Sequence, residues 1–205
     1  MNRSELKENA KLSLKGKYIE VIKMNLLYFI ISFAAGACLG FVCGIFNINN
    51  SIIELLSNLL TIFISGLFGF GQISFYLKIS RNEEVTYKEL FNKTELLLSF
   101  IIISLLIGLF TFLWSLLFII PGIIASISYS FAYYIALDNP SLSPREVIKK
   151  SKEMLKGHKM DLFLLTLSFV GWIILSLFTF GLLYIWLIPY MNVTICNFYN
   201  KIKEL

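Results

Sequence analysis

The chain has 205 residues, of which 57% are hydrophobic and only 15% are charged. This composition predicts an all-α, polytopic membrane protein that forms a single integral domain over residues 1–205. The formal net charge is +5, but the basic residues are scattered among acidic ones beside apolar segments, which argues against a nucleic-acid partner.

Four long segments carry no charged residue: 24–53, 55–77, 96–137 and 162–200. A run of roughly 20 apolar residues crosses the hydrocarbon core once, so the last two segments are long enough for two crossings each. We therefore predict six transmembrane helices in three hairpins, at about 25–46, 55–77, 96–119, 122–138, 161–178 and 183–200. Residues 1–23 are too rich in charge to be a cleavable signal peptide.

All 18 Lys and Arg residues fall on one side of this arrangement, with six in residues 1–23, four in 78–95, six in 138–161 and two in 201–205. The positive-inside rule then places both termini and the two charged loops in the cytoplasm. The same distribution predicts contact with anionic lipids at the inner leaflet.

Each predicted hairpin follows a basic amphipathic segment. In residues 1–23, apolar side chains recur every four positions at Leu6, Ala10, Leu14, Tyr18 and Ile22, which suits a helix lying in the membrane interface. Residues 86–93 form a shorter version with a Thr86–Glu89 capping box. Residues 143–157 form the clearest helix, with the start and stop signals Ser143, Pro144, Glu146 and Gly157.

Small residues mark the faces where helices approach closely. Gly36, Gly40 and Gly44 stand four apart on the first predicted span. We expect this face to pack within the molecule, against Gly66 and Gly69 of the second span. A dimer interface is the alternative.

Prolines interrupt two of the long apolar segments. Pro121-Gly122 is expected to end the third span at the outer surface, and Pro189 to kink the sixth.

Polar residues within the predicted spans are few and uncharged. Ionisable groups inside the membrane usually mark proton relays, so their absence argues against a proton-driven transporter. Transport or handling of an apolar molecule, lipid or peptide remains the alternative function. It predicts a cavity lined by Asn58, Gln72, Asn192 and Tyr190.

The sequence offers no cofactor or metal site and no clear catalytic group. Cys38, Cys43 and Cys196 lack metal-site spacing and lie inside predicted spans, where they suit packing. His158 is the single histidine. A membrane enzyme would require His158 to converge with Asp138 and Asp161, and we predict that the protein is not an enzyme.

One pattern resembles a known family. Its residues are Pro121-Gly122-Ile123, Tyr129-Ser130, Tyr134, Asp138-Asn139-Pro140, Ser151-Lys152, Gly157-His158-Lys159, Ser168-Phe169, Gly171-Trp172, Thr179, Gly181, Pro189-Tyr190 and Phe198-Tyr199. Together they resemble an uncharacterised family of Gram-positive bacterial integral membrane proteins, of the domain-of-unknown-function 975 type. The chain is more distantly similar to the non-catalytic membrane domain of some glycerophosphodiester phosphodiesterases. These resemblances imply a helical membrane fold and a location in a bacterial cytoplasmic membrane. They imply no activity.

The matching residues near the inner surface form the candidate interaction site: Asp138, Asn139, Pro140, Ser151, Lys152, Gly157, His158 and Lys159. We expect Asp138 to pair with Lys152 or Lys159; a fixed re-entry geometry without further function is the alternative. The leading interpretation is a non-catalytic interaction or accessory protein, with a membrane protein or a second copy of the chain as partner.

Overall fold

The computed structural model describes residues 2–46 and 48–204, and the regular structure in these residues is helical throughout, as predicted. The elements in chain order are α1 (Arg3–Leu14), α2 (Tyr18–Ile45), α3 (Asn50–Ser80), the 3-10 helices η1 (Tyr87–Phe91) and η2 (Thr94–Leu96), α4 (Leu97–Leu117), α5 (Ile119–Tyr129), α6 (Ala132–Asp138), α7 (Pro144–Met154), α8 (Lys159–Leu167), α9 (Val170–Phe178) and α10 (Tyr184–Lys203).

The N-terminal amphipathic segment forms a helix and a turn rather than one helix through residue 22. Asn2 caps α1, because its side chain accepts hydrogen bonds from the backbone N–H groups of Ser4 and Glu5. The chain then turns through Gly16, whose φ of +80° lies in the left-handed region that glycine adopts without a steric penalty. A new helix, α2, starts at Tyr18.

The apolar stripes of the two long amphipathic segments face the protein interior. On α1 the stripe packs against α10, and on α7 it packs against α5 and α6. The buried side chains of the two stripes are Leu6, Ala10 and Leu14 on α1, and Val147, Ile148 and Leu155 on and just after α7. Leu6, Ala10 and Leu14 therefore face α10, whereas Ile22, which also belongs to the predicted stripe, is exposed on α2.

The third amphipathic segment is the 3-10 helix η1 and lacks the predicted capping box. The Thr86 side chain makes no capping hydrogen bond. The Glu89 carboxylate instead forms an ion pair with Lys78 on α3, with 2.7 Å between Nζ and Oε1. This pair ties the loop to α3.

Within residues 2–46 and 48–204, five helical segments are long and apolar enough to cross a membrane: Tyr18–Ile45, Asn50–Ser80, Tyr87–Leu117, Ile119–Asp138 and Lys159–Phe178. The sixth predicted span, 183–200, coincides with the 20-residue helix α10, which is not among these five. The chain stays helical through Pro189 in α10. Between α4 and α5 it turns at Phe118, and Pro121-Gly122 lies in the first turn of α5.

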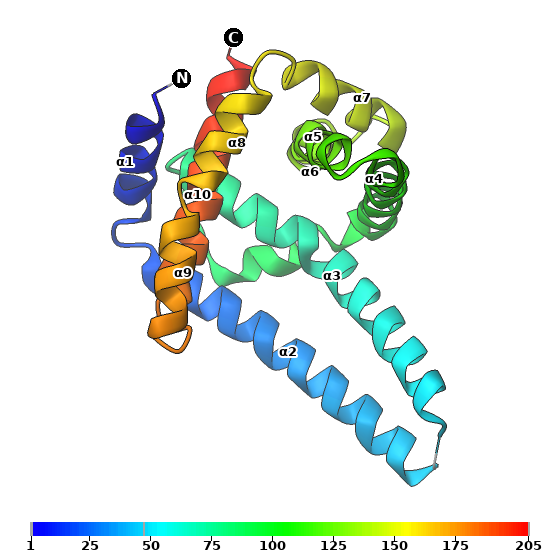
Figure 1. Ribbon diagram of the computed structural model, residues 1–205. Coiled ribbons are helices and arrows are strands. Elements are labelled where there is room, and N and C mark those ends of the chain that lie inside the picture. The colour runs from blue at the N-terminus through cyan, green and yellow to red at the C-terminus, as the bar shows by residue number, and fades with distance from the viewer. Residues whose placement is uncertain (1, 47, 205) are drawn as a thin grey trace.

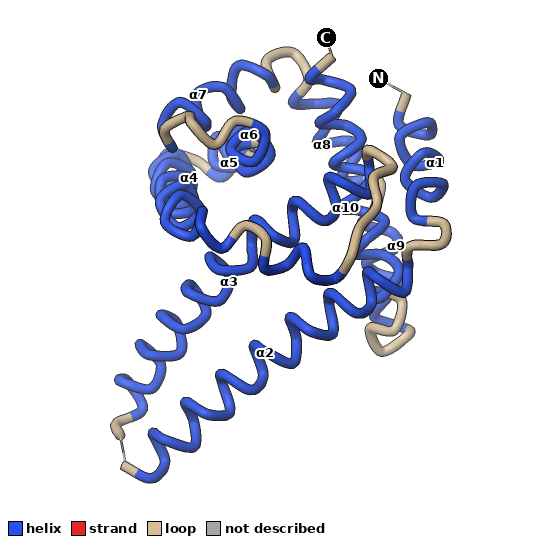
Figure 2. The backbone as a smooth tube through the Cα atoms, turned by 180° about the vertical axis from the view of Figure 1, so that it is seen from behind, coloured by secondary structure: helices blue, strands red, loops and turns tan. Residues whose placement is uncertain are grey.

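The long helices diverge from a common end of the molecule. In Figures 1 and 2, α2 and α3 project together as a long hairpin, α8 and α9 run beside α10, and α4 and α5 are viewed along their axes. Within the molecule the hydrophobic window of Ile119–Asp138 is 50% buried, whereas those of the other four segments are only 6–22% buried. Most of the apolar span surface is therefore uncovered in the single chain.

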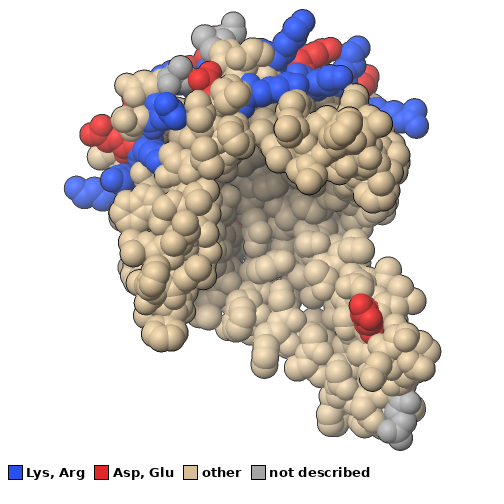
Figure 3. Space-filling view, viewed as in Figure 1, with Lys and Arg blue, Asp and Glu red and all other residues tan. Residues whose placement is uncertain are grey.

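The charged residues gather at the end from which the helices diverge. Figure 3 shows Lys and Arg interleaved with Asp and Glu over this end, with an almost uncharged surface, drawn tan, below it. Between residues 24 and 77 the only charged residue is Glu54, near the start of α3 at the tip of the α2–α3 hairpin. The molecule thus has a charged end and an apolar remainder.

The glycine-rich face of α2 has no close neighbour in the part of the chain that the structure describes. A Cβ atom added at Gly36, Gly40 or Gly44 would meet no atom within 4 Å. Gly66 and Gly69 of α3 pack closely instead against α4, where an added Cβ would crowd the side chains of Leu97, Ile101 and Phe100. The predicted contact between the two glycine sets is therefore wrong, because α4 takes the position expected of α2.

Candidate functional site

Asp138 lies where three helices end. It is the last residue of α6, and its carboxylate meets Arg81, which caps the C-terminus of α3, and Tyr199 and Lys203 of α10. Arg81 Nη2 donates to both carboxylate oxygens, at 3.1 Å to Oδ1 and 2.9 Å to Oδ2. Tyr199 Oη donates at 2.9 Å and Lys203 Nζ at 2.7 Å, both to Oδ2. One carboxylate thus joins three distant segments.

The donors are themselves held in place. Arg81 Nε donates to Asn200 Oδ1 at 3.3 Å, and Asn200 Nδ2 donates to Ser80 Oγ at 3.0 Å. Partial burial lowers the pKa of Arg81, but the hydrogen bond and negative charge of Asp138 outweigh it and raise that pKa overall. The Asp138 side chain is only 10% exposed, so its charge is compensated by protein groups rather than by water.

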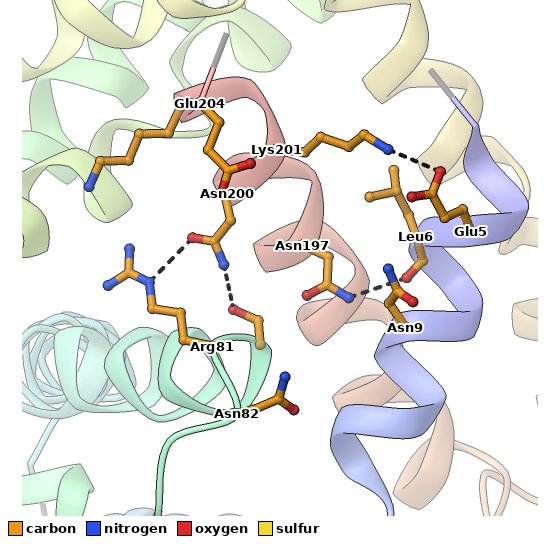
Figure 4. Close-up of a pocket in the computed structure, with 11 residues that line it drawn as sticks. Glu5, Leu6, Asn9, Arg81, Asn82, Asn197, Asn200, Lys201 and Glu204 are labelled. Carbon is orange, nitrogen blue, oxygen red and sulfur yellow. Dashed lines mark hydrogen bonds and ion pairs between the residues drawn. The ribbon is translucent and has the colours of Figure 1, made fainter.

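An open polar cavity of about 740 Å³ lies beside this network, between α1, the end of α3 and α10 (Figure 4). Its wall presents both charges and amides: Glu5, Leu6, Asn9, Ser80, Arg81, Asn82, Asn197, Asn200, Lys201, Lys203 and Glu204. Lys201 Nζ pairs with Glu5 Oε2 at 3.0 Å, and Asn197 Nδ2 donates to the Leu6 carbonyl at 3.3 Å. These two contacts fasten the first helix to the last.

The predicted interaction site is divided between two places: Asp138 lies in this network, whereas Lys152 and Lys159 border a separate groove along α5. Asp138 occupies the network just described, so its predicted ion pair with Lys152 or Lys159 is wrong. Asn139 caps α6 by donating from Nδ2 to the Ile135 carbonyl at 3.3 Å, and Pro140 is exposed in the turn that follows.

The α7 part of the predicted site is mainly structural. The capping box of Ser143 and Glu146 is confirmed, with Pro144 in the first turn. Ser151 is fully buried: its Oγ donates to the Ser128 carbonyl at 2.9 Å and accepts from the Phe131 N–H at 3.2 Å. Ser151 therefore holds the break between α5 and α6 against α7.

The turn after α7 takes the predicted form. Gly157 has φ +90°, which suits glycine. His158 Nδ1 lies 3.3 Å from Asp161 Oδ2, on the first turn of α8. Asp138 does not join His158 and Asp161, because its carboxylate is hydrogen-bonded to Arg81, Tyr199 and Lys203.

No motif in the sequence indicates that Arg81, Tyr199 and Lys203 bind Asp138, or that Asn200 accepts from Arg81. Their shared signal is position, since each lies at the border between an apolar segment and a charged one. The polar residues expected to line a transport cavity are also spread out. Asn58 is exposed on α3, Asn192 donates to the Ile188 carbonyl, and Tyr190 borders a groove with Lys11.

No group of three or more His, Cys, Asp or Glu side chains suited to a metal ion occurs among residues 2–46 and 48–204. Of the three cysteines, Cys43 and Cys196 are buried and Cys38 is exposed, and none forms a disulfide.

The chain belongs to the family described as "Protein of unknown function (DUF975)", whose model matches residues 1–128 and 116–205 and so covers the whole chain. No curated protein and no solved structure matches it. The family identity agrees with the resemblance seen in the sequence and assigns no activity.

Proposed function

We propose that this is a non-catalytic integral protein of a bacterial cytoplasmic membrane, with six spans and cytoplasmic termini, that acts as an interaction or accessory component. The observation that carries the proposal is the uncovered apolar surface of the diverging helices, four of whose hydrophobic windows are 6–22% buried. Lipid covers part of such a surface, and the remainder can receive helices of another protein.

Contacts between the first and last helices support an even number of crossings. Lys201 on α10 pairs with Glu5 on α1, and Asn197 donates to the carbonyl of Leu6. These contacts support termini on the same face of the membrane. Counting α2, α3, α4, α5 with α6, α8 with α9, and α10 as one crossing each gives six.

The topology is tested by cysteine labelling. In a background lacking Cys38, Cys43 and Cys196, Glu54→Cys and Glu153→Cys are treated in whole cells with a membrane-impermeant maleimide. We expect labelling at residue 54 in intact cells and at residue 153 only after permeabilisation. Labelling of both positions, or the reverse pattern, would contradict the proposed orientation.

A partner helix could approach the backbone of α2 most closely at the face formed by Gly36, Gly40 and Gly44. This face is open, because a Cβ at each position would meet nothing within 4 Å. The interaction role is tested by purification in native-lipid discs, followed by mass spectrometry of co-purifying proteins. We expect a stoichiometric membrane protein or a second copy of the chain, and loss of that partner in Gly40→Leu.

A matched control separates this effect from unfolding. Leu105→Ala changes an exposed apolar residue of α4 and should leave the partner bound. If Gly40→Leu retained the partner at the wild-type ratio, the glycine face would not be the interface. If wild-type discs contained no protein partner, the interaction role would fail.

Handling of an apolar molecule is the second candidate, favoured by the hollow that Figure 3 shows between the diverging parts of the molecule, below the charged end. It predicts a stoichiometric lipid or peptide in the same discs, lost on substitution of Asn58 or Asn192. A bound small molecule without a co-purifying protein would favour this role over the accessory one.

A further inference from the structure

A groove runs along α5 from the charged end of the molecule into its apolar surface. It has a volume of about 310 Å³, at the lower end of the range of small-molecule sites. Its lining comes from α4, α5, α7 and α8: Trp114, Pro121, Ile124, Ala125, Ser128, Tyr129, Lys152 and Lys159. The lining therefore combines two cationic side chains with a strip of apolar ones.

The polar groups gather at one end of the groove. Ser151, the neighbour of Lys152, donates to the carbonyl of Ser128, the neighbour of Tyr129. This hydrogen bond fixes α7 beside the C-terminal end of α5 and brings Lys152 and Tyr129 to the same level. Lys159 reaches the groove from the start of α8, which also packs against α5. Trp114 and Pro121 lie toward the opposite end, at the turn between α4 and α5.

Among the described residues Lys152 and Lys159 form no ion pair, although Lys149 pairs with Glu153 on the same helix. Tyr129 has a ring contact with Phe110 and lines the groove. Its hydroxyl makes no hydrogen bond to another described residue, so it can donate to an acceptor bound in the groove.

We propose that this groove binds one anionic glycerophospholipid from the inner leaflet. Its phosphate would lie between Lys152 and Lys159 and accept from Tyr129 Oη, and an acyl chain would follow Ala125, Ile124 and Trp114. The charge complementarity selects an anionic lipid, and the apolar strip selects a lipid over free phosphate. The proposal rests on the orientation under the proposed function, and not on the accessory role.

Other grooves on the molecule lack this combination. The groove bordered by Lys11 has Tyr18, Trp172, Trp186 and Tyr190 in its wall, and that bordered by Lys23 has Leu26, Leu27, Ile30 and Tyr87. Each has a single lysine. The polar cavity between α1 and α10 has Arg81, Lys201 and Lys203 in its wall, but Leu6 is the one apolar residue of its lining. The α5 groove differs from these three because it joins two cations to an apolar strip.

Native mass spectrometry of the purified protein tests the proposal, with phosphatidylglycerol and phosphatidylcholine of identical chains titrated in the same detergent. We expect one phosphatidylglycerol to be retained in preference to phosphatidylcholine. Each lysine near an anionic headgroup raises the binding affinity about fivefold. The double variant Lys152→Gln with Lys159→Gln should therefore weaken phosphatidylglycerol binding about 30-fold. Tyr129→Phe should weaken it several-fold while keeping the ring contact with Phe110.

The matched control is Lys149→Gln with Lys150→Gln, which removes the same charge from α7 outside the groove and should retain the lipid. Equal retention of the two lipids by the wild type would overturn the proposal, as would wild-type affinity in the Lys152/Lys159 variant. Competition by soluble glycerol phosphate alone would also overturn it, because the acyl chain would then play no part. The cysteine-labelling result is independent, so a failed orientation and a failed lipid site are distinguishable.

Discussion

Asp138→Asn is expected to destabilise the protein more than any other single exchange at its charged end. The carboxylate accepts from Arg81, Tyr199 and Lys203, which belong to two different helical segments. Asparagine keeps one acceptor oxygen but loses the negative charge. It also introduces an amide donor among groups that can only donate, namely the guanidinium and the ammonium.

The magnitude follows from the burial of each partner. Tyr199 is 1% exposed, so its hydroxyl without an acceptor costs about 1–3 kcal/mol. The Arg81 and Lys203 side chains are 32% and 50% exposed, and solvent screening limits each of their pairs to about 0.2–1 kcal/mol. The free energy of unfolding should therefore fall by about 2–4 kcal/mol.

The measurement is unfolding by SDS titration in mixed micelles, followed by the fluorescence of the three tryptophans. Tyr199→Phe serves as the control, because it removes one hydrogen bond and should cost only about 1 kcal/mol. The double variant should lose less than the sum of the two single losses, since both act on the same contact. A loss below about 0.5 kcal/mol in Asp138→Asn would refute the argument that this network stabilises the charged end.

Three further predictions use the same unfolding assay. Gly71→Ala should lower the free energy of unfolding by about 1–3 kcal/mol, because a Cβ there would overlap the backbone carbonyl of Leu90. Gly40→Ala, where a Cβ meets open space, should change it by less than about 0.5 kcal/mol. Equal effects of the two substitutions would contradict the packing. Ser151→Ala should cost about 2–3 kcal/mol, because two buried backbone groups lose their partner, and a neutral result would be inconsistent with the bridge to α5. Ser143→Ala should cost about 1 kcal/mol. Hydrogen bonds from Ser143 lower the pKa of Glu146, so the stabilisation by this cap is present at neutral pH and is lost as the pH falls through that folded-state pKa. An NMR titration should show the Glu146 pKa rising in the variant, and an unchanged value would count against the capping box.

Local signals in the sequence predicted the local structure well. The box of Ser143 and Glu146 and the stop at Gly157 depend on neighbours within a few residues, and they appear where expected. The all-helical architecture followed from continuous apolar runs, which predict helices without knowledge of their partners.

Contacts between residues far apart in the chain were harder to predict from the sequence. The partners of Asp138 lie 57 to 65 residues away, and many charged residues share the same end of the molecule. Nearby Lys152 and Lys159 were therefore an equally reasonable choice from sequence. A small-residue face likewise signals that a helix can approach closely without specifying which helix, so α4 rather than α2 packs against Gly66 and Gly69.

The buried side chains and the uncovered apolar surface lie in different parts of this molecule, so stability and interaction with a partner should depend on different residues. Large buried side chains such as Phe131, Phe198 and Tyr199 gather near the charged end, where Asp138 also joins three helix termini. The diverging helices contribute little burial of their own. Substitutions at the charged end should therefore lower the free energy of unfolding, whereas substitutions on the outer faces, such as Gly40→Leu, should change what binds and leave unfolding nearly unaltered. A partner lost together with stability would place that partner at the charged end rather than on the apolar faces.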